Sequence, residues 1–410
     1  MVKHPPLQIS DKVQGIPEAL SIYINQLAYA QKRRGMDVIV LSLGEAFFDI
    51  PAFDFSKLDF VKGYHYSDSQ GIPELREVIS RFYKRQYGVN IDAQNEILIT
   101  AGSKPVIYFA MQAALNNGDE VLIHEPAWLS YQEQARLVGA VATFIPYDIE
   151  VKDFHRYFNE KTKMLIINNP NNPAGRIYTE TELQSIYEQC RTRGIYVLVD
   201  EAYSDFVIED EFHSMAKIAE NKEGIIVVNS LSKNMGMSGW RVGYVIAQPV
   251  FIRAILKLNQ HIITCAPTIL QYYMAEYFDE VIALTLPQVH DVVRKRERIS
   301  SFMKDIGLKC MQGNATFYFL VNLENFPGTS FDFALYLFFK HQIAVVPGSA
   351  YGKSCARFIR VGIGAESDER IFQALLVIKD LILTDHFDPM WARNKVLTEG
   401  FHLFEEAQGL

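Results

Sequence analysis

Lys233 is the residue of this 410-residue chain whose surroundings point most directly to chemistry. It follows the apolar run 225–228 and lies in the segment 230–233 (SLSK), with Arg241 eight positions further on. A buried strand would therefore deliver an amine to a loop rich in hydroxyls and glycines, close to a guanidinium. This arrangement suits a lysine that forms a Schiff base with an aldehyde whose phosphate lies nearby. The alternative is a solvated surface lysine, the usual position of this residue type.

A carboxylate stands at the end of another apolar run. Asp200 follows residues 195–199 and precedes Tyr203 by three positions. An ionised carboxylate at a buried strand end needs a partner. A protonated heterocyclic nitrogen would be such a partner, and the pair would keep that nitrogen protonated. Tyr203 could donate to a phenolic oxygen of the same ring. The alternative for Asp200 is a structural ion pair with an arginine.

Three more segments after predicted strands carry signals of ligand binding. Residues 168–175 (NNPNNPAG) hold two Asn-Pro units and a glycine, which predict an irregular turn whose asparagine amide can reach a ligand. In residues 100–104 (TAGSK), Gly102 allows close backbone approach, and the first amides of the next helix can bind phosphate. Trp128 could stack on a flat ring. Taken singly, these features are an ordinary turn, an ordinary strand–helix junction and a core aromatic residue.

Strands and helices are expected to alternate along most of the chain. This order predicts an α/β fold whose large domain has a mostly parallel sheet with helices on both faces. In such sheets, ligands bind beyond the carboxyl ends of the strands, where the polar segments fall. The expected strands are residues 38–43, 96–100, 120–124, 140–145, 164–168, 195–199, 225–229 and 242–247, and the expected helices include 72–86, 104–115, 131–137 and 180–193.

A smaller α/β domain is expected to follow. A helical region from about residue 250 to 306 is interrupted only by Pro267 and Pro287. After it we expect strands at 317–321, 343–346 and 358–362 and helices at 331–341 and 368–383. The expected division is an N-terminal arm (1–43) that joins the small domain, a large cofactor-binding domain (44–290), a small C-terminal domain (291–383) and an extension (384–410) that is an extra helix or partly ordered.

Composition narrows the class of protein. The length exceeds that of a typical single core, and 49% of the residues are hydrophobic, which favours two domains. A net charge of −8 gives no electrostatic footprint for nucleic acid. Four scattered cysteines form neither a disulfide framework nor a metal-binding spacing. With no signal peptide and no apolar run long enough to span a bilayer, we expect a cytoplasmic protein without metal, membrane or nucleic-acid partners.

Together these motifs resemble one family, the fold-type I, pyridoxal-phosphate-dependent aminotransferases of class I/II, also called the aspartate aminotransferase family. The resemblance covers roughly residues 38–383, and residues 66–76 and 128–131 look closest to its bacterial branch. It implies pyridoxal 5′-phosphate as cofactor, an amino acid and a 2-oxo acid as substrates, and a homodimer with active sites at its interface. Transfer of an amino group through a Lys233 Schiff base is the implied reaction.

The resemblance also assigns roles around the cofactor ring. Lys233 would carry the Schiff base and then move the proton between the substrate Cα and the cofactor. Asp200 would pair with the pyridine nitrogen, and with Lys233 and Tyr203 it would form the catalytic set. Asn172 and Tyr203 would bind the phenolic oxygen, and Trp128 would stack on the ring.

The remaining roles concern the phosphate and the substrate. Tyr66 would reach the phosphate of the neighbouring subunit. Arg360 matches the arginine that binds the substrate α-carboxylate with a bidentate fork, beside the Gly44 backbone and Asn172. The other implied phosphate ligands are Ser230, Ser232, Arg241 and the backbone amides of Gly102, Ser103 and Lys104.

The chain departs from the family pattern where side-chain selectivity is set. Ala46 and Phe47 stand where relatives usually have Pro and Asp, and residues 19–20 are apolar where dicarboxylate-specific members carry hydroxyl groups. Residues 313–318 lack the Pro and Gly often found there, and Lys104 could still pair with a distal carboxylate. The amino donor therefore stays open. A β-eliminating lyase of the same fold is the alternative reaction. A binding or regulatory protein is disfavoured by the complete set of site residues.

Overall fold

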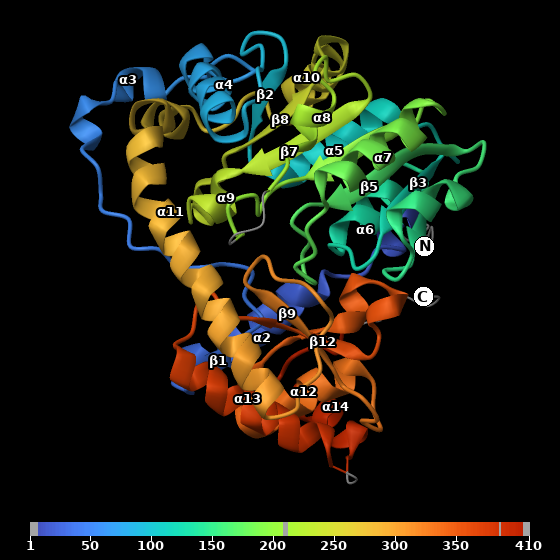
Figure 1. Ribbon diagram of the computed structural model, residues 1–410. Helices are drawn as coiled ribbons and strands as arrows, with labels where there is room; N and C mark the ends of the chain where they lie inside the picture. Colours follow the sequence, from blue (N-terminus) through green and yellow to red (C-terminus); the bar gives the residue numbers. More distant parts are fainter. Residues whose placement is uncertain (1–6, 208–211, 385–386, 405–410) are drawn as a thin grey trace, which may run out of the picture.

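The computed structural model describes residues 7–207, 212–384 and 387–404. Two groups of strands lie one above the other, and the long helix α11 (Thr268–Asp305) runs from one to the other (Figure 1). The upper group is a seven-stranded sheet, here called the large sheet. The lower group is a three-stranded sheet, here called the small sheet, with a separate two-stranded pair beside it.

The large sheet is mostly parallel, as the sequence predicts. Its strand order is β2-β8-β7-β6-β5-β3-β4, and only the pairs β2–β8 and β8–β7 are antiparallel. The strands read as continuous apolar runs because helices cover both faces. Their bounds are β2 (Ile97–Thr100), β3 (Glu120–His124), β4 (Val141–Ile145), β5 (Thr162–Asn168), β6 (Tyr196–Asp200), β7 (Ile225–Ser230) and β8 (Gly243–Ala247).

Alternate side chains of the large sheet enter two different cores. Leu165 and Val197 pack with one set of helices, whereas Met164 and Leu198 pack with the other. The first set is α4 (Pro73–Tyr87), α7 (Glu180–Arg191), α8 (Met215–Ile218) and the first half of α11, and the second is α5 (Ser103–Ala114), α6 (Ser130–Leu137) and α10 (Pro249–Ile262).

Short helices complete both parts of the molecule. The short helix that matters most for the site is α9 (Leu231–Asn234), which follows β7 directly. The others are α1 (Asp11–Gln14) and α3 (Phe60–Gly63), and the 3-10 helices η1 (Phe55–Lys57), η2 (Val151–Tyr157), η3 (Ser238–Trp240), η4 (Gly348–Tyr351) and η5 (Lys353–Cys355).

The small sheet is antiparallel, in the order β11-β12-β9. The expected strand 343–346 is wrong in one respect, because it is divided between two sheets. β10 pairs with β1 and β11 pairs with β12, so the chain changes partner at Val345. The bounds here are β1 (Ile39–Val40), β9 (Tyr318–Asn322), β10 (Ile343–Ala344), β11 (Val346–Pro347), β12 (Phe358–Gly362), α2 (Leu20–Arg33), α12 (Ser330–His341), α13 (Asp368–Ile382) and α14 (Pro389–Thr398).

Pro287 does not interrupt helix α11, contrary to expectation. Proline removes one backbone hydrogen bond and leaves the carbonyl four residues earlier without its donor. That carbonyl belongs to Ala283, which is exposed, so water can serve it. Pro267, in contrast, is the N-cap residue of α11. The expected division between residues 290 and 291 therefore falls inside a continuous helix.

The C-terminal extension contains the extra helix that the sequence suggested, α14 (Pro389–Thr398). It packs against α12, and the Phe404 ring after it lies 5.4 Å from the Tyr23 ring of α2. The Tyr23 hydroxyl donates to the His402 carbonyl at 2.8 Å. The extension thus contacts both α2 and α12.

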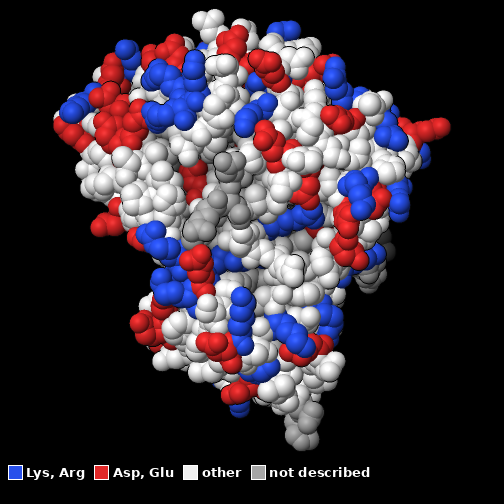
Figure 2. Space-filling view, viewed as in Figure 1, with Lys and Arg blue, Asp and Glu red and all other residues white. Residues whose placement is uncertain are grey.

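Charged side chains of both signs are interspersed over the visible face of the molecule (Figure 2). Within residues 7–207, 212–384 and 387–404, no helix is both long and apolar enough to cross a membrane.

Candidate active site

The candidate site lies where the carboxyl ends of β5, β6 and β7 face strands β9 and β12 of the small sheet. Lys233 is on α9, directly after β7. Asp200 is the last residue of β6, and Asn172 is in the turn after β5. Arg360 is on β12 and contacts the Asn172 side chain across the gap. Segments distant in sequence therefore meet at one place, as the family resemblance implies.

Lys233 is held as a largely desolvated amine. Its Nζ donates to the carbonyl of Gly44 at 2.6 Å. Desolvation lowers its pKa from 10.5 to about 8, with opposing influences from nearby charges. Glu45 and Asp200 favour the cation, whereas Arg360 and Arg241 disfavour it. A solvated surface lysine would not combine a lowered pKa with a hydrogen bond to the Gly44 carbonyl. The alternative stated above, that Lys233 is such a lysine, therefore does not fit the structure.

Asp200 is a buried carboxylate whose partners are neutral. Tyr131 Oη donates to Oδ2 at 2.7 Å, and the Ala202 amide donates to Oδ1 at 3.1 Å. Burial raises its pKa, and these two hydrogen bonds together with the more distant Lys233 charge only partly oppose the effect. Among the described residues no lysine or arginine forms an ion pair with Asp200. A bound cation would therefore stabilise this carboxylate.

The turn at 168–175 is fixed by its own side chains. Asn168 Oδ1 accepts from the Asn172 amide at 2.6 Å, and Asn168 Nδ2 donates to the Asp200 carbonyl at 2.7 Å. The Asn172 side chain then lies between two groups. Its Nδ2 donates to Tyr203 Oη at 3.2 Å, and its Oδ1 accepts from Arg360 Nη1 at 3.5 Å. The turn is therefore a rigid platform, and an ordinary surface turn is excluded.

Arg360 is buried without an acidic partner. Only 4% of its surface is exposed, and among the described residues no carboxylate pairs with it. Nη2 donates to the Ser42 carbonyl at 2.8 Å, while Nε has no hydrogen-bond partner among the described residues. The guanidinium carbon lies 4.4 Å from the Tyr318 ring centroid and 5.3 Å from that of Tyr351. A buried cation with a free donor fits a carboxylate ligand.

Positive groups converge at the amino end of α5. Gly102 is its N-cap residue with φ of 85°, and a Cβ there would lie 2.4 Å from Arg241 Nη2. Only glycine lets the guanidinium approach the helix start this closely. The free amides of residues 103 and 104 and the Arg241 side chain therefore form a site suited to phosphate. Ser230 and Ser232 lie beside it, with Ser230 Oγ accepting from the Ser232 amide.

Trp128 and Lys104 contact each other at the edge of the site. The Lys104 Nζ lies 5.0 Å from the Trp128 ring centroid. Burial and the Arg241 charge lower the Lys104 pKa. Trp128 also meets the Tyr131 ring edge-on at 5.2 Å, and Tyr131 in turn holds Asp200. The tryptophan is thus next to the carboxylate rather than in a remote core.

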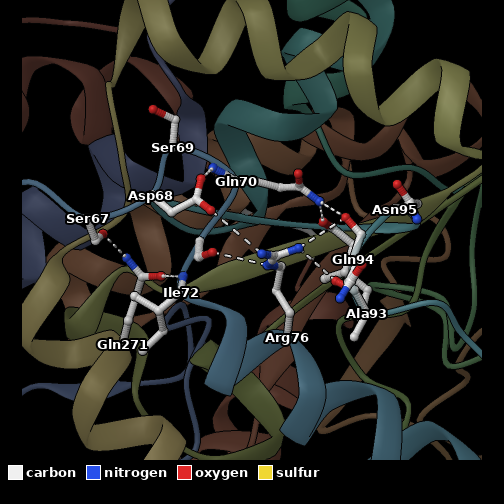
Figure 3. Close-up of polar contacts among 12 residues, drawn as sticks. Ser67, Asp68, Ser69, Gln70, Ile72, Arg76, Ala93, Gln94, Asn95 and Gln271 are labelled. Carbon is white, nitrogen blue, oxygen red and sulfur yellow. Dashed lines mark hydrogen bonds and ion pairs between the residues drawn. The ribbon is translucent and has the colours of Figure 1, made fainter.

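Tyr66 is far more exposed than the residues around Lys233, with 85% of its surface accessible. The loop that follows it is held in place by buried side chains of α4 and α11 (Figure 3). Gln271 Nε2 donates to Ser67 Oγ at 3.0 Å, and Arg76 Nε donates to the Gly71 carbonyl at 3.1 Å. Arg76 Nη2 also lies 3.6 Å from Asp68 Oδ2. A firmly held loop therefore presents an exposed tyrosine.

Two tyrosines of the site were missed in the sequence. Tyr131 follows Trp128 closely, and its role depends on α6 turning its hydroxyl towards Asp200. Tyr318 lies within the predicted strand 317–321, and its hydroxyl lies 3.0 Å from that of Tyr203. Neither contact has a signal in spacing or composition, because both depend on how separate elements pack.

A cavity of about 1190 Å³ lies elsewhere, behind the 168–175 turn. His124, Arg176 and Lys304 are among its lining residues. Of the residues with expected roles, none lines it. The chemistry is therefore assigned to the cluster around Lys233 and not to this cavity.

The fold and the site together define a class of enzyme. The site offers a desolvated amine, a buried carboxylate in need of a cation, a phosphate cradle and a buried arginine with a free donor. These groups fit a phosphorylated aldehyde with a cationic ring nitrogen, and a substrate that carries a carboxylate.

The family follows from comparison with known proteins. The model of the family "Aminotransferase class I and II" matches residues 25–377. The chain belongs to this family, and it is an aminotransferase. It is 34% identical over 362 residues to the (5-formylfuran-3-yl)methyl phosphate transaminase of Methanocaldococcus jannaschii, covering 87% of this chain and 95% of the relative. It is 32% identical over 396 residues to a probable aspartate/prephenate aminotransferase of Aquifex aeolicus, covering 90% and 98%.

Solved structures agree with this assignment. The aspartate aminotransferase from Thermus thermophilus with maleate superposes with a TM-score of 0.83 at 26% identity, covering 92% of this chain and all of the other. An aromatic aminotransferase from Pyrococcus horikoshii gives a TM-score of 0.79 at 29% identity, covering 87% and 98%. The fold is that of these enzymes, and the names of the relatives favour transamination over the β-eliminating lyase reaction.

Proposed function

We propose that this aminotransferase uses pyridoxal 5′-phosphate, attached to Lys233, to move an amino group between an amino acid and a 2-oxo acid. One observation carries the proposal. Lys233 is an amine with a pKa lowered to about 8, within electrostatic reach of both Asp200 and Arg360. The first is the group that a cationic ring nitrogen needs, and the second is the group that a carboxylate substrate needs.

The residues present would hold the cofactor at three points. Asp200 would face the ring nitrogen, and Asn172 and Tyr203 would bind the phenolic oxygen. Trp128 would lie along the ring. The phosphate would be bound by Ser230, Ser232, Arg241 and the backbone amides of Ser103 and Lys104. The Gly102 amide, also expected there, donates to the Thr100 carbonyl at 2.8 Å. When bound, the cofactor supplies an electron sink for the electrons released when the substrate Cα–H bond breaks.

The proton movements fall to the protein. With the cofactor bound, the Lys233 amine would act as the general base that removes and returns the proton at the substrate Cα. Its lowered pKa suits this role, because much of the amine is neutral near pH 8. Arg360 orients the substrate by its α-carboxylate, with Asn172 and the Gly44 backbone beside it. Fixing one end of the substrate places its Cα near the Lys233 amine.

The side-chain end of the substrate pocket is mostly apolar, with one cation. Ala46 is buried, and 64% of the Phe47 surface is exposed. Lys104 is the proposed cation, and its Nζ lies 5.0 Å from the Trp128 ring centroid. Aspartate and prephenate in the name of one relative, and maleate bound to another, motivate acidic donors in a first panel. Aromatic donors belong beside them, since an aromatic aminotransferase shares the fold.

The proposed assembly is a homodimer in which Tyr66 completes the partner's phosphate site. In support, Tyr66 is exposed on a loop that Arg76 and Gln271 hold, and exposed apolar residues Phe47, Val61 and Tyr64 lie near it in sequence. Residues 44–290 form the proposed cofactor domain, and 1–43 with 291–383 form the proposed small domain. The proposed compartment is the cytoplasm, which suits four free cysteine thiols.

Absorbance spectroscopy tests the proposed reaction. Purified protein loaded with pyridoxal phosphate is mixed with each amino donor in turn, and the band of the attached cofactor is followed. We expect suitable donors to replace this band with that of the pyridoxamine form, and a 2-oxo acid to restore it. A spectrum unaffected by every donor contradicts the proposal. Pyruvate and ammonia released from cysteine-type substrates without any 2-oxo acid would instead support the lyase.

A hybrid experiment tests the shared site. A Lys233→Ala variant and a Tyr66→Phe variant are mixed under conditions that exchange subunits. A mixed dimer contains one site with both native residues only if Tyr66 acts across the interface. We expect the mixture to regain activity above the sum of its components. If Tyr66 serves its own chain, no site in the mixture has both residues and no such gain occurs.

A further inference from the structure

Tyr318 lies at the meeting point of the two halves of the site. It is fully buried at the start of β9 on the small sheet. Its hydroxyl oxygen lies 3.0 Å from that of Tyr203, and its ring lies under the Arg360 guanidinium at 4.4 Å. A Cβ on Gly44 would be 3.4 Å from the same hydroxyl. Tyr318 thus contacts the proposed phenol-binding tyrosine through its hydroxyl and the proposed carboxylate-binding arginine through its ring.

The Asn172 amide constrains which way the hydrogen bonds run. Arg360 can only donate, so the Asn172 atom that it contacts is the oxygen, and the Asn172 nitrogen faces Tyr203. Tyr203 Oη therefore accepts one hydrogen bond from Asn172. A phenol oxygen can accept a second one and still keep its own proton to donate.

The neighbouring charges favour Tyr318 as the donor between the two phenols. Burial raises the pKa of Tyr318, but the Arg360 cation over its ring opposes this rise by stabilising the ionised phenol, so Tyr318 is the more acidic of the two phenols. Burial, the contact with Tyr318 and the Asp200 charge raise the pKa of Tyr203 well above the usual value, and Arg360 only partly opposes this. With Tyr318 donating, the Tyr203 proton is free for a ligand. Hydrogen bonds in such a chain strengthen one another.

We propose that Tyr318 is a positioning residue that donates to Tyr203, so that Tyr203 donates its own proton to the phenolic oxygen of the cofactor. The inference rests on the proposed function and adds a residue to it. Because Tyr318 also packs beneath Arg360, one side chain from the small sheet adjusts both cofactor binding and carboxylate binding. One substitution removes the hydroxyl contact alone, and a second removes both contacts.

The chain offers a matched control in Tyr351. Its ring also lies under Arg360, at 5.3 Å, but its buried hydroxyl has no hydrogen-bond partner among the described residues. Tyr318→Phe removes only the hydroxyl that meets Tyr203 and keeps the ring under Arg360. Tyr351→Phe removes a comparable hydroxyl that has no hydrogen-bond partner among the described residues. Tyr318→Leu removes both the hydroxyl and the ring.

The experiment measures equilibrium binding and a spectral titration rather than turnover. Each variant is stripped of cofactor and titrated with pyridoxal phosphate, and the absorbance of the loaded protein is followed against pH. Maleate serves as the carboxylate probe, and the melting temperature checks folding. We expect Tyr318→Phe to weaken cofactor binding by about 2- to 10-fold, the value of one neutral hydrogen bond. The absorbance transition should move to higher pH, since the ionised phenolic oxygen loses stabilisation.

The remaining variants complete the test. Tyr318→Phe should bind maleate like the unsubstituted protein, whereas Tyr318→Leu should bind it more weakly. Tyr351→Phe should leave cofactor affinity and the pH of the transition unchanged. The proposal is overturned if Tyr318→Phe matches the unsubstituted protein, or if Tyr351→Phe changes as much as Tyr318→Phe does. A protein that binds no pyridoxal phosphate before any substitution would instead overturn the proposed function itself.

Discussion

The two sides of the site differ in how completely the protein satisfies its own polar groups. On the large sheet, both carboxylate oxygens of Asp200 accept hydrogen bonds, and Asn168 uses its amide oxygen and its amide nitrogen. On the small sheet, Arg360 has a buried Nε without a partner among the described residues, and its contact with Asn172 is long at 3.5 Å.

This difference corresponds to what each side is proposed to bind. A cofactor that stays attached through many turnovers is best held by groups that are already fixed in position. A substrate that enters and leaves in each half-reaction needs donors that the protein itself does not occupy. The large sheet therefore provides a fixed frame, and Arg360 provides the exchangeable contact. The following predictions test this contrast, beginning with the largest expected effect.

Loss of the Lys233 amine should have the greatest effect. Lys233→Ala removes the attachment point and the general base together, and activity should fall by about 10³-fold or more. Lys233→Arg is the matched control, because it keeps a cation but provides no comparable nucleophile, and it should be equally inactive. Initial rates with a donor and a 2-oxo acid measure the effect. Substantial activity in either variant would contradict the assigned role.

Loss of the Asp200 charge should be the next largest effect. Asp200→Asn keeps an oxygen for the Tyr131 hydroxyl but cannot stabilise a cationic ring nitrogen. We expect kcat to fall on the order of 10²-fold, comparable with the removal of one preorganised electrostatic group. Without cofactor, the same variant should be at least as stable to heat, because a buried unpaired charge has been removed. A marked loss of stability without cofactor would assign Asp200 a structural role instead.

Substitution of Arg360 should act on substrate binding. Arg360→Gln removes charge-assisted hydrogen bonds to the α-carboxylate, and KM should rise roughly 10- to 100-fold. The affinity for pyridoxal phosphate should change little, because the fixed frame is on the other sheet. Arg298→Gln is the control, since Arg298 is an exposed arginine paired with Asp368. If Arg360→Gln mainly weakened cofactor binding, the contrast between the two sides would fail.

The pH dependence of cofactor attachment should reveal the desolvated amine. A lysine reacts as the neutral amine, so a lowered pKa extends its reactivity to lower pH. For Lys233 the rate of attachment to the stripped protein should rise with pH around a midpoint near 8. Stopped-flow absorbance measures this rate. A midpoint near the ordinary value of 10.5 would show that the amine is solvated.

Much of this site could be predicted from the sequence, because its residues follow apolar strands. Lys233, Asp200 and the 168–175 turn each come directly after a buried run, and strand ends in a parallel sheet lie at one edge. The same pattern gave the mostly parallel sheet and the extra helix of the extension.

The rest depended on packing that no local pattern encodes. The contact of Tyr131 with Asp200 and that of Tyr318 with Tyr203 each join elements far apart in the chain. Pro287 predicts an interrupted helix, yet α11 continues through it, and Ala283, whose carbonyl loses its donor, is an exposed residue. The division of residues 343–347 between two sheets follows from their different partners.

Chemical trapping tests the central claim most directly. The protein loaded with pyridoxal phosphate is reduced with borohydride, digested, and mapped by mass spectrometry. The account predicts one pyridoxyl group, carried by the peptide that contains Lys233. The group on another lysine, or on none, would contradict it.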